Sequence, residues 1–246
     1  MKAVIMAGGN ATRLHPLTLA TNKHLLPIYD KPVIYYGLQT IVDAGIDRIM
    51  IITSPQYVED FVKLLGSGQQ FTSQKTGSQI QIVYGIQNSA SGIAYGLHIA
   101  SDYIGTDSCL LYLGDNIIED SLAEDVKSFT TGAKVFLKEV ADPERFGVAT
   151  VDQNGQVTEI IEKPKEPKSN WAVVGTYLYD NTVFAKLKDL KLSARGELEI
   201  TDLNNLYVQE GNLAGVTLKK PWFDIGTFDS LVEASVYMKQ KHHDNK

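Results

Sequence analysis

The sequence AVIMAGGNATRLHPLTLATNKHLLPIYDKP, residues 3–32, starts with an apolar run and continues into a glycine turn followed by two cations. The apolar residues 3–6 predict a strand, Gly8 and Gly9 the turn, and Arg13 and Lys23 are the cations. Glycine lets the backbone approach phosphate oxygens, which nearby cations then neutralise. The stretch therefore fits a phosphate-binding loop, and taken alone it equally fits an ordinary turn between a strand and a helix with solvated charges.

Composition narrows the class of protein. The chain has 246 residues, 43% of them hydrophobic, which predicts one globular unit of one or two closely joined domains. No run approaches the roughly 20 apolar residues of a spanning helix, and the N-terminus indicates a strand rather than a signal peptide. We therefore expect a cytoplasmic protein without a membrane partner. A net charge of −6 argues against nucleic-acid binding but allows a phosphorylated metabolite held by a few local cations.

Strand and helix patterns alternate through the first half of the chain. Helical spacing over 34–42, 58–65 and 93–104 alternates with strand patterns over 48–53 and 80–86. The run CLLYLGDN, residues 109–116, predicts a strand buried on both faces, as in a parallel sheet, with Cys109 inside it. Asp115 follows this strand at the edge where open α/β sheets bind ligands. A metal or catalytic role and a plain capping role are both open for it.

The second half predicts antiparallel strands. Strand patterns over 133–140, 147–152 and 171–179 accompany a turn at 153–155, which favours a hairpin. Residues 201–209 and 227–239 have helical patterns. Glu162 and Lys163 end a further strand before a charged, proline-rich loop, and a solvated ion pair is the plain interpretation of these two side chains.

Seven motifs occur in an order and spacing similar to the sugar-1-phosphate nucleotidylyltransferases of bacteria and archaea, and the resemblance covers about residues 2–235. They are GGNATRLHPLT, NKHLLPIYDKPVIYY, LGDN, DPERFGVA, IEKPKEPKS, SARGELEITDLN and WFDIGT. The resemblance implies an α/β fold of the nucleotide-diphospho-sugar transferase type. This fold has a Rossmann-like, mixed and mostly parallel sheet flanked by helices, with a β-rich sugar-binding portion. It also implies a single domain over 1–246, with residues 1–130 mainly binding the nucleotide and residues 131–246 mainly the sugar phosphate.

The resemblance also implies the reaction. Members of the family join a nucleoside triphosphate to a sugar 1-phosphate and release pyrophosphate. The attacking phosphate oxygen is already anionic, so no Ser, His or Asp nucleophile is needed, and catalysis depends on alignment and charge stabilisation. The motifs are most similar to the branch that uses dTTP and glucose 1-phosphate.

Other functions stay open at this point. UTP or another sugar 1-phosphate would need the same chemistry, and a non-catalytic nucleotide-sugar sensor is a third hypothesis. A sensor need not keep the cations and acids of the leaving-group machinery, which argues against it. A P-loop kinase is disfavoured because the glycine turn lacks G-K-[ST], and a dinucleotide dehydrogenase because G-x-G-x-x-G is absent.

Site residues follow from the resemblance, position by position. The nucleotide-binding set is Gly8, Gly9, Thr12, Gln87 and Gly92, the last two at the pyrimidine edge. Arg13 would contact the β- and γ-phosphates with Thr12 and assist pyrophosphate departure, and Lys23 would contact phosphates near the reacting centre. Mg²⁺ would be held by Asp115 and Asp224, since magnesium takes one or two acids plus phosphate oxygens and waters.

On the sugar side the resemblance assigns a second set of residues. Gly147 would give a backbone contact, Glu162 would accept hydrogen bonds from sugar hydroxyls, and Tyr177 would line the pocket. Lys163, counted with Arg13 and Lys23 as catalytic, and Arg195 would hold the phosphate. Arginine can engage a phosphate through two parallel N–H donors, so Arg195→Lys should not be conservative.

The sequence departs from the family pattern at three points. Ala11 stands where a glycine is usual, which costs about 1 kcal/mol if the position needs a positive φ. Ala90 replaces a common proline in the base loop, which weakens a preference for thymine over uracil. Longer members continue into a helical extension that helps build an effector site. We therefore expect feedback inhibition to be absent or weak. We also expect a homo-oligomer, because homo-oligomers are common in the family.

Overall fold

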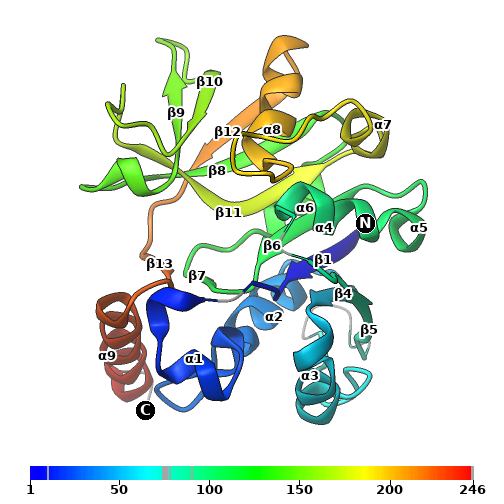
Figure 1. Cartoon of the computed structure of the whole chain (residues 1–246), viewed down its shortest axis with the longest axis vertical. Helices are drawn as coiled ribbons and strands as arrows, with labels where there is room; N and C mark the ends of the chain where they lie inside the picture. The colour runs from blue at the N-terminus through cyan, green and yellow to red at the C-terminus, as the bar shows by residue number, and fades with distance from the viewer. Residues whose placement is uncertain (10, 74–76, 78, 90, 245–246) are drawn as a thin grey trace.

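The structure, a computed structural model, describes residues 1–9, 11–73, 77, 79–89 and 91–244. Within these residues nine strands form one mixed sheet with helices on both faces (Figure 1). The order is β10-β9-β11-β6-β1-β4-β5, and β8 joins β12 to β11. These strands are β1 (Lys2–Met6), β4 (Arg48–Thr53), β5 (Gln81–Ile86), β6 (Cys109–Leu113), β8 (Ala133–Glu139), β9 (Gly147–Val151), β10 (Val157–Glu162), β11 (Trp171–Tyr179) and β12 (Leu213–Thr217).

The first half of the sheet is parallel, as the sequence predicts. β1 lies between β4 and β6 and runs parallel to both, and β5 is parallel to β4. Successive residues of β1 enter different cores, Val4 on one face of the sheet and Ile5 on the other. This two-sided burial explains why β1 and β6 have continuous apolar sequences instead of alternating ones.

The second half continues the same sheet in the opposite direction. β11 is antiparallel to β6, β8 and β9, and β9 and β10 form the predicted hairpin. Two small two-stranded sheets lie outside this one: β2 (Pro27–Ile28) with β3 (Lys31–Pro32), and β7 (Asn116–Ile118) with β13 (Trp222–Asp224). The expected mixed sheet with a β-rich second half is confirmed.

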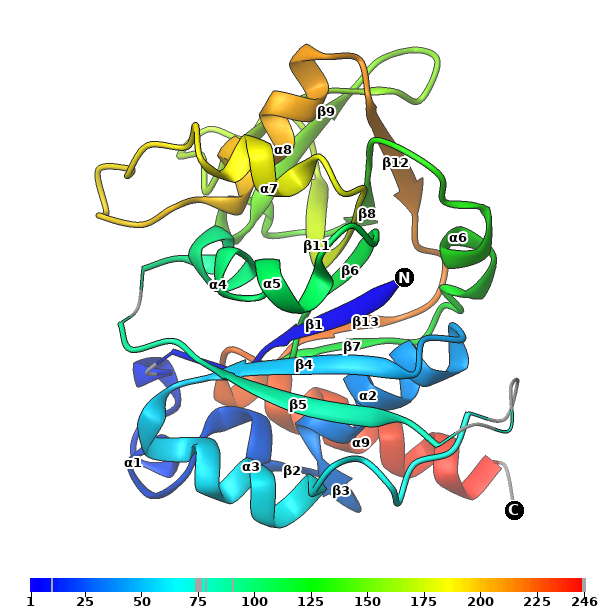
Figure 2. The ribbon, with the colours of Figure 1, turned by 90° about the vertical axis from the view of Figure 1, so that its right-hand side faces the viewer.

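Helices cover both faces of the sheet. Figure 2 shows α2 and α3 on one side of the parallel strands and α4 and α5 on the other. The helices are α1 (Leu17–Ala20), α2 (Val33–Asp43), α3 (Val58–Leu65), α4 (Ile93–Ile99), α5 (Ser101–Ile104), α6 (Ala123–Ser128), α7 (Val183–Leu187), α8 (Ile200–Gln209) and α9 (Phe228–Asp244), with 3-10 turns η1 (Thr12–Leu14), η2 (Lys23–Leu25), η3 (Pro55–Tyr57) and η4 (Pro143–Arg145). No helix in the described part of the chain has the length and apolarity needed to cross a membrane.

One predicted helix differs from the structure. The pattern over 93–104 is divided into α4 and α5 at Ala100, which has φ −81° and ψ 0°. No glycine or proline marks the break, and both short helices bury apolar residues in the same core as β1 and β6. The break keeps both segments on the sheet, and the spacing of apolar residues does not reveal it.

Candidate active site

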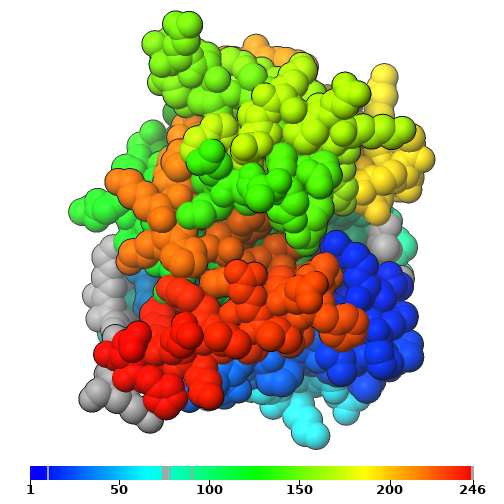
Figure 3. Space-filling view, turned by 90° about the vertical axis from the view of Figure 1, so that its left-hand side faces the viewer, coloured from blue at the N-terminus to red at the C-terminus, as the bar shows by residue number. Residues whose placement is uncertain are grey.

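Three distant parts of the chain meet at one face of the molecule. Figure 3 shows residues near the N-terminus in blue, residues around 140–170 in green and the C-terminal part in orange and red. Side chains from all three, Arg13, Arg145 and Asp224, line one cavity of about 270 Å³. A second cavity of about 250 Å³ adjoins it and shares the lining residues Ile93, Leu113 and Glu197.

The glycine turn after β1 borders the second cavity and is open on its ligand side. A Cβ built at Gly8 or Gly9 would meet no atom within 4 Å, and Gly9 has φ +96°. The turn is fixed from behind, because the carbonyl of Ala7 accepts hydrogen bonds from Asn22 Nδ2 at 3.1 Å and Thr53 Oγ1 at 3.2 Å. The space beside the glycines is therefore available to a ligand rather than filled by the protein.

Ala11 makes the turn that glycine usually makes. It has φ 44° and ψ 43°, so it adopts the left-handed conformation instead of shifting the loop. Its carbonyl accepts hydrogen bonds from Thr18 Oγ1 at 2.9 Å and Leu14 N at 3.0 Å, which hold it there. Asn10 lies outside the described residues, as does Ala90 in the base loop. Thr12 is exposed at the start of η1 and lines neither cavity.

The backbone brings the two predicted metal ligands together. Asp115 follows β6 after one glycine, Gly114, and Asp224 ends β13, which pairs with β7 so that Asp224 lies opposite Asn116. A hydrogen bond of 2.9 Å from Ile225 N to the carbonyl of Asp115 joins the two segments next to the carboxylates. Asn116 Nδ2 donates to Asp115 Oδ1 at 3.0 Å and orients that side chain.

Lys23 neutralises one of these aspartates. Its ammonium forms an ion pair and hydrogen bond with the Asp115 carboxylate. Burial is the largest influence on the Asp115 carboxyl and raises its pKa, but the charges of Lys23 and His24 and the hydrogen bonds from Lys23 and Asn116 together lower that pKa to about 2. The neighbouring His24 stays neutral, because burial and then the charge of Lys23 lower its pKa to about 3.

Asp224 carries the surplus negative charge. Burial and then the charge of Asp115 raise the pKa of Asp224 to about 6, although Lys23, Arg13 and Arg145 lower it. Arg145 Nη2 lies 3.9 Å from Asp224 Oδ2. Gly226 leaves room for this arrangement, since a Cβ there would lie 2.9 Å from Arg13 Nη2 and 3.1 Å from Asp224 Oδ2.

The aspartate pair suits a metal ion such as magnesium, which takes further ligands from substrate and water, better than a metal held by protein ligands alone. The described residues contain no group of three or more His, Cys, Asp or Glu side chains placed to bind a metal. Magnesium is usually held by one or two carboxylates together with substrate phosphates and water. The buried Asp115 and the partly buried Asp224, only one of which has a close lysine, match that donor set.

The residues predicted for the sugar side line the 270 Å³ cavity. They are Gly147, Glu162, Lys163, Tyr177 and Arg195. Glu162 Oε2 accepts a hydrogen bond from Thr201 Oγ1 at 2.7 Å, and Glu162 Oε1 lies 3.5 Å from Lys163 Nζ. Lys163 has φ 44°, a strained conformation for a lysine, and its amide donates to the carbonyl of Phe146 at 2.9 Å. Burial raises the pKa of Tyr177 well above its ordinary value, so its hydroxyl stays protonated.

The base-side residues line the 250 Å³ cavity with Gly8, Gly9, Lys23 and Asp115. Gln87 is buried, and its Nε2 donates to the carbonyl of Gly92 at 3.4 Å. Gly92 has φ +97°, and a Cβ there would lie 2.3 Å from the carbonyl oxygen of Leu198.

Two residues that shape the site, Arg145 and Asn116, were not predicted from the sequence. Arg145 lies within DPERFGVA, from which only Gly147 was assigned, and its Nη1 contacts Asp142 Oδ2 at 2.5 Å. Asn116 Oδ1 accepts hydrogen bonds from Trp222 Nε1 at 2.6 Å and from the Gly175 amide at 3.3 Å. The motif DPERFGVA could have indicated Arg145. Nothing in the sequence near Asn116 indicates its distant partners, Trp222 and Gly175.

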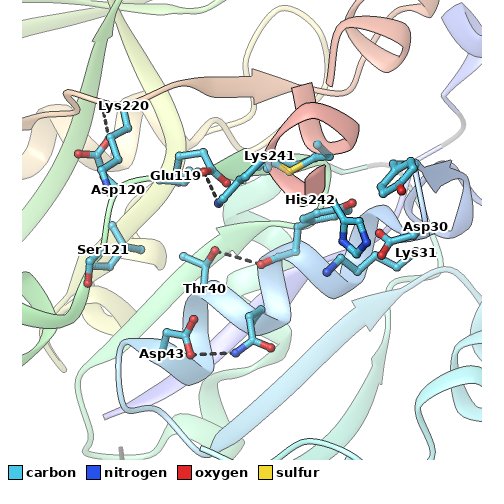
Figure 4. A pocket seen from close by; sticks show the side chains of 17 residues that line it. Asp30, Lys31, Thr40, Asp43, Glu119, Asp120, Ser121, Lys220, Lys241 and His242 are labelled. Atoms are coloured by element: carbon cyan, nitrogen blue, oxygen red, sulfur yellow. Dashed lines mark hydrogen bonds and ion pairs between the residues drawn. The ribbon is translucent and has the colours of Figure 1, made fainter. Parts of the chain in front are cut away.

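A larger cavity of about 400 Å³ lies elsewhere, between α2, β7 and α9 (Figure 4). Two of its acidic side chains have protein partners: Lys241 forms an ion pair with Glu119, and Asp120 accepts a hydrogen bond of 2.7 Å from the backbone amide of Lys220. None of the predicted site residues lines it. We therefore place the candidate site in the two smaller, adjoining cavities.

The fold and the gathering of cations and carboxylates at one sheet edge define an α/β protein suited to phosphorylated ligands. The chain belongs to the nucleotidyl transferase family, whose model matches residues 2–241. It is 43% identical over 244 residues to a glucose-1-phosphate thymidylyltransferase of Mycolicibacterium smegmatis, covering 97% of this chain and 82% of that protein. The corresponding protein of Neisseria meningitidis is 44% identical over 245 residues, covering 97% of this chain and 83% of that protein.

Solved structures agree with this membership. A putative glucose-1-phosphate thymidylyltransferase from Bacillus anthracis, in complex with a sucrose, matches with a TM-score of 0.89 and 46% identity over 96% of this chain and 94% of that one. A UDP-glucose pyrophosphorylase complexed with UDP-glucose matches with a TM-score of 0.83 and 25% identity, covering 98% of both chains. The nucleotide-diphospho-sugar transferase fold is thereby confirmed, and the chain is a nucleotidyltransferase.

Proposed function

We propose that this enzyme transfers a deoxythymidylyl group from dTTP to glucose 1-phosphate, giving dTDP-glucose and pyrophosphate. The observation that carries the proposal is the pair of adjoining cavities, one lined by Asp115 and the other by Asp224 and Arg13. One cavity has the open glycine turn and Gln87, and the other has Glu162, Lys163 and Arg195. The names of the thymidylyltransferase relatives support dTTP and glucose 1-phosphate as the two occupants.

The reaction needs alignment rather than a protein nucleophile. A phosphate oxygen of glucose 1-phosphate forms a bond to the α-phosphorus of dTTP, and the bond from that phosphorus to the bridging oxygen of pyrophosphate breaks. Both substrates are anionic, so the protein must bring like charges together and stabilise the charge on the leaving group. Lys23 and Lys163 flank the two phosphates to be joined, and Arg13 neutralises the departing pyrophosphate.

The two carboxylates complete this set of charges. Asp115 and Asp224 would hold Mg²⁺, which neutralises phosphate oxygens and helps to orient them. The raised pKa of Asp224 supports this assignment, because a cation next to the pair would relieve the repulsion between the carboxylates. Arg145, close to Asp224, adds positive charge to the cavity that would hold the sugar phosphate.

We divide the substrates between the halves of the single domain. Residues 1–130 bind mainly the nucleotide, with Gly8, Gly9 and Thr12 at the phosphates, and residues 131–246 bind mainly the sugar phosphate. Gln87 and Gly92 contact the base, while Gly147, Glu162 and Tyr177 contact the sugar. From the sequence we still predict that the protein is a homo-oligomer and that it works in the cytoplasm.

A pyrophosphate-release assay tests the proposal. The protein is crossed with dTTP, UTP, CTP, GTP and ATP against several sugar 1-phosphates, with and without Mg²⁺. We expect the highest kcat/KM for dTTP with glucose 1-phosphate and no turnover after chelation of the metal. Higher kcat/KM with UTP would reassign the base, and no turnover in any combination would favour a nucleotide-sugar sensor.

A further inference from the structure

We infer that Glu199 is a positioning residue, which holds the Arg195 guanidinium in the orientation from which it binds the phosphate of the sugar substrate. The inference rests on the proposed function, because the phosphate-binding role of Arg195 is part of it. It concerns how a side chain on an exposed loop becomes a defined phosphate ligand.

The contact between the two side chains is bidentate. Arg195 Nε donates to Glu199 Oε1 at 3.1 Å, and Arg195 Nη2 donates to Glu199 Oε2 at 2.8 Å. The arginine side chain is 44% exposed, whereas the glutamate side chain is 11% exposed. Two parallel hydrogen bonds fix the plane of a guanidinium, which a single ion pair does not. The buried partner therefore defines the orientation of the exposed one.

Glu199 is itself held in place. It stands at the N-cap of α8, but its side chain makes no capping hydrogen bond, so both oxygens are available to other donors. Ser193 Oγ donates to Glu199 Oε1 at 2.7 Å and accepts a hydrogen bond from the Arg195 amide at 3.2 Å. Helix α8 is anchored to β10, because the Asn205 amide bonds both the N–H and the carbonyl of Ile160 at 3.0 and 2.7 Å. Arg195 is thus tied to a rigid element through Glu199.

The opposite edge of the guanidinium remains available for phosphate. Arginine has five N–H donors, and the pair with Glu199 uses only one edge of the group. The other carboxylates near Nη2 are more distant, Glu162 at 3.5 Å and Glu197 at 3.9 Å. A phosphate can replace these longer contacts while the Glu199 pair stays intact. The orientation is then fixed before the substrate arrives, which lowers the entropy lost on binding.

Glu199 could instead compete with phosphate for Arg195, and the two roles predict opposite changes in phosphate affinity when the charge of Glu199 is removed. If Glu199 merely competed with phosphate for Arg195, removing its charge would tighten phosphate binding. If Glu199 positions Arg195, removing the charge weakens binding. The matched control is Glu197, which also lines both cavities and faces the same Nη2 atom at 3.9 Å, but forms no paired contact with the guanidinium. Glu197→Gln therefore removes a charge at the site without removing a bidentate contact.

The test compares Glu199→Gln with Glu197→Gln, each made in the wild-type chain and in an Arg195→Ala background. Calorimetry gives the Kd of glucose 1-phosphate and of inorganic phosphate without turnover, and kinetics give the KM of each substrate. We expect Glu199→Gln to weaken binding of both phosphate ligands about tenfold and to leave the KM for dTTP within about twofold. Glu197→Gln should change these affinities less than about threefold.

The Arg195→Ala background separates positioning from a structural role. There Glu199→Gln should have little further effect, because two residues that act as a unit are not additive. Ser193→Ala removes one hydrogen bond to a Glu199 oxygen and should also weaken phosphate binding, by a smaller factor. This variant replaces Glu199→Gln in the test if Glu199→Gln does not fold. Unchanged or tighter binding in Glu199→Gln, or equal weakening in both backgrounds, would overturn the inference. Wild-type turnover in the same preparation decides the proposed function separately, and the inorganic phosphate measurements stand whichever sugar phosphate is used.

Discussion

Replacing Asp224 by asparagine should make the metal-free protein more stable while removing its activity. Asp224 has a pKa of about 6 in the folded protein, against the ordinary value of 3.8, because it is buried next to Asp115. Each pKa unit corresponds to about 1.4 kcal/mol, so at pH 8 the ionised carboxylate destabilises the fold by up to about 3 kcal/mol. Asparagine has nearly the same shape and no charge. Asp224→Asn should therefore raise the free energy of unfolding by about 1–3 kcal/mol at pH 8.

The pH dependence has a defined sign. The folded-state pKa is raised, so the folded protein binds this proton more tightly than the unfolded chain does. The penalty is absent below about pH 4, grows as the pH rises through 6, and is then constant. The difference between Asp224→Asn and wild type should consequently shrink towards zero between pH 8 and pH 4.

Urea unfolding in the presence of EDTA, followed by far-UV circular dichroism, measures this difference. Asp115→Asn is the matched control, because Lys23 lowers the pKa of Asp115 to about 2. Removing that charge leaves Lys23 unpaired, so the control should lose about 2 kcal/mol at pH 8. Added Mg²⁺ should stabilise the wild type and leave Asp224→Asn nearly unchanged. A lower stability of Asp224→Asn than of wild type at pH 8, or a gain in stability that does not depend on pH, would contradict this prediction.

Three further substitutions test local parts of the site. Gly92→Ala places a Cβ 2.3 Å from the carbonyl oxygen of Leu198 at a φ of +97°, so it should lower the free energy of unfolding by about 2 kcal/mol or more; an unchanged urea midpoint would contradict the crowding. Ala11→Gly relieves a left-handed alanine at the cost of unfolded-chain entropy, so stability should rise by up to about 1 kcal/mol, and a lower midpoint would count against it. Arg195→Lys cannot keep a paired contact with Glu199, so the KM for glucose 1-phosphate should rise about tenfold while the KM for dTTP stays the same; equal changes in both would refute a phosphate-specific role.

The sequence predicted those parts of the fold that are encoded by neighbouring residues. Strands β1 and β6 were predictable because burial on both faces leaves an uninterrupted apolar run. The division of one helix at Ala100 was not predictable, since both parts keep apolar residues on the sheet. The short strands β7 and β13 also have no signal of their own: each has three residues, and their pairing depends on segments far apart in the chain.

The candidate site likewise has features that the sequence predicts and features that only the structure shows. The family motifs identified Asp115 and Asp224 as partners, but only the backbone bond between Ile225 and the Asp115 carbonyl shows how they are held together. Ala11 was recognised as a departure, and its left-handed backbone could be learned only from the structure. Glu199 lay within a quoted motif, yet its role depends on both its carboxylate oxygens facing Arg195.

The reversal of direction in the sheet explains why two substrates can meet at one edge. Parallel strands such as β6 deliver Asp115 at their carboxyl ends, whereas the antiparallel β11 brings its amino-terminal part to the same edge, with Thr176 opposite Tyr112. Val173 and Gly175 in this part of β11 therefore line the sugar cavity beside the end of β6, and Tyr177, opposite Leu111, lines it further along the strand. Gly175 permits the close approach, because a Cβ there would lie 2.7 Å from Leu113 Cδ1 and 2.9 Å from Asn116 Nδ2. A parallel strand at this position would present its carboxyl end instead, so the antiparallel strand gives the sugar its own set of residues at the nucleotide's edge.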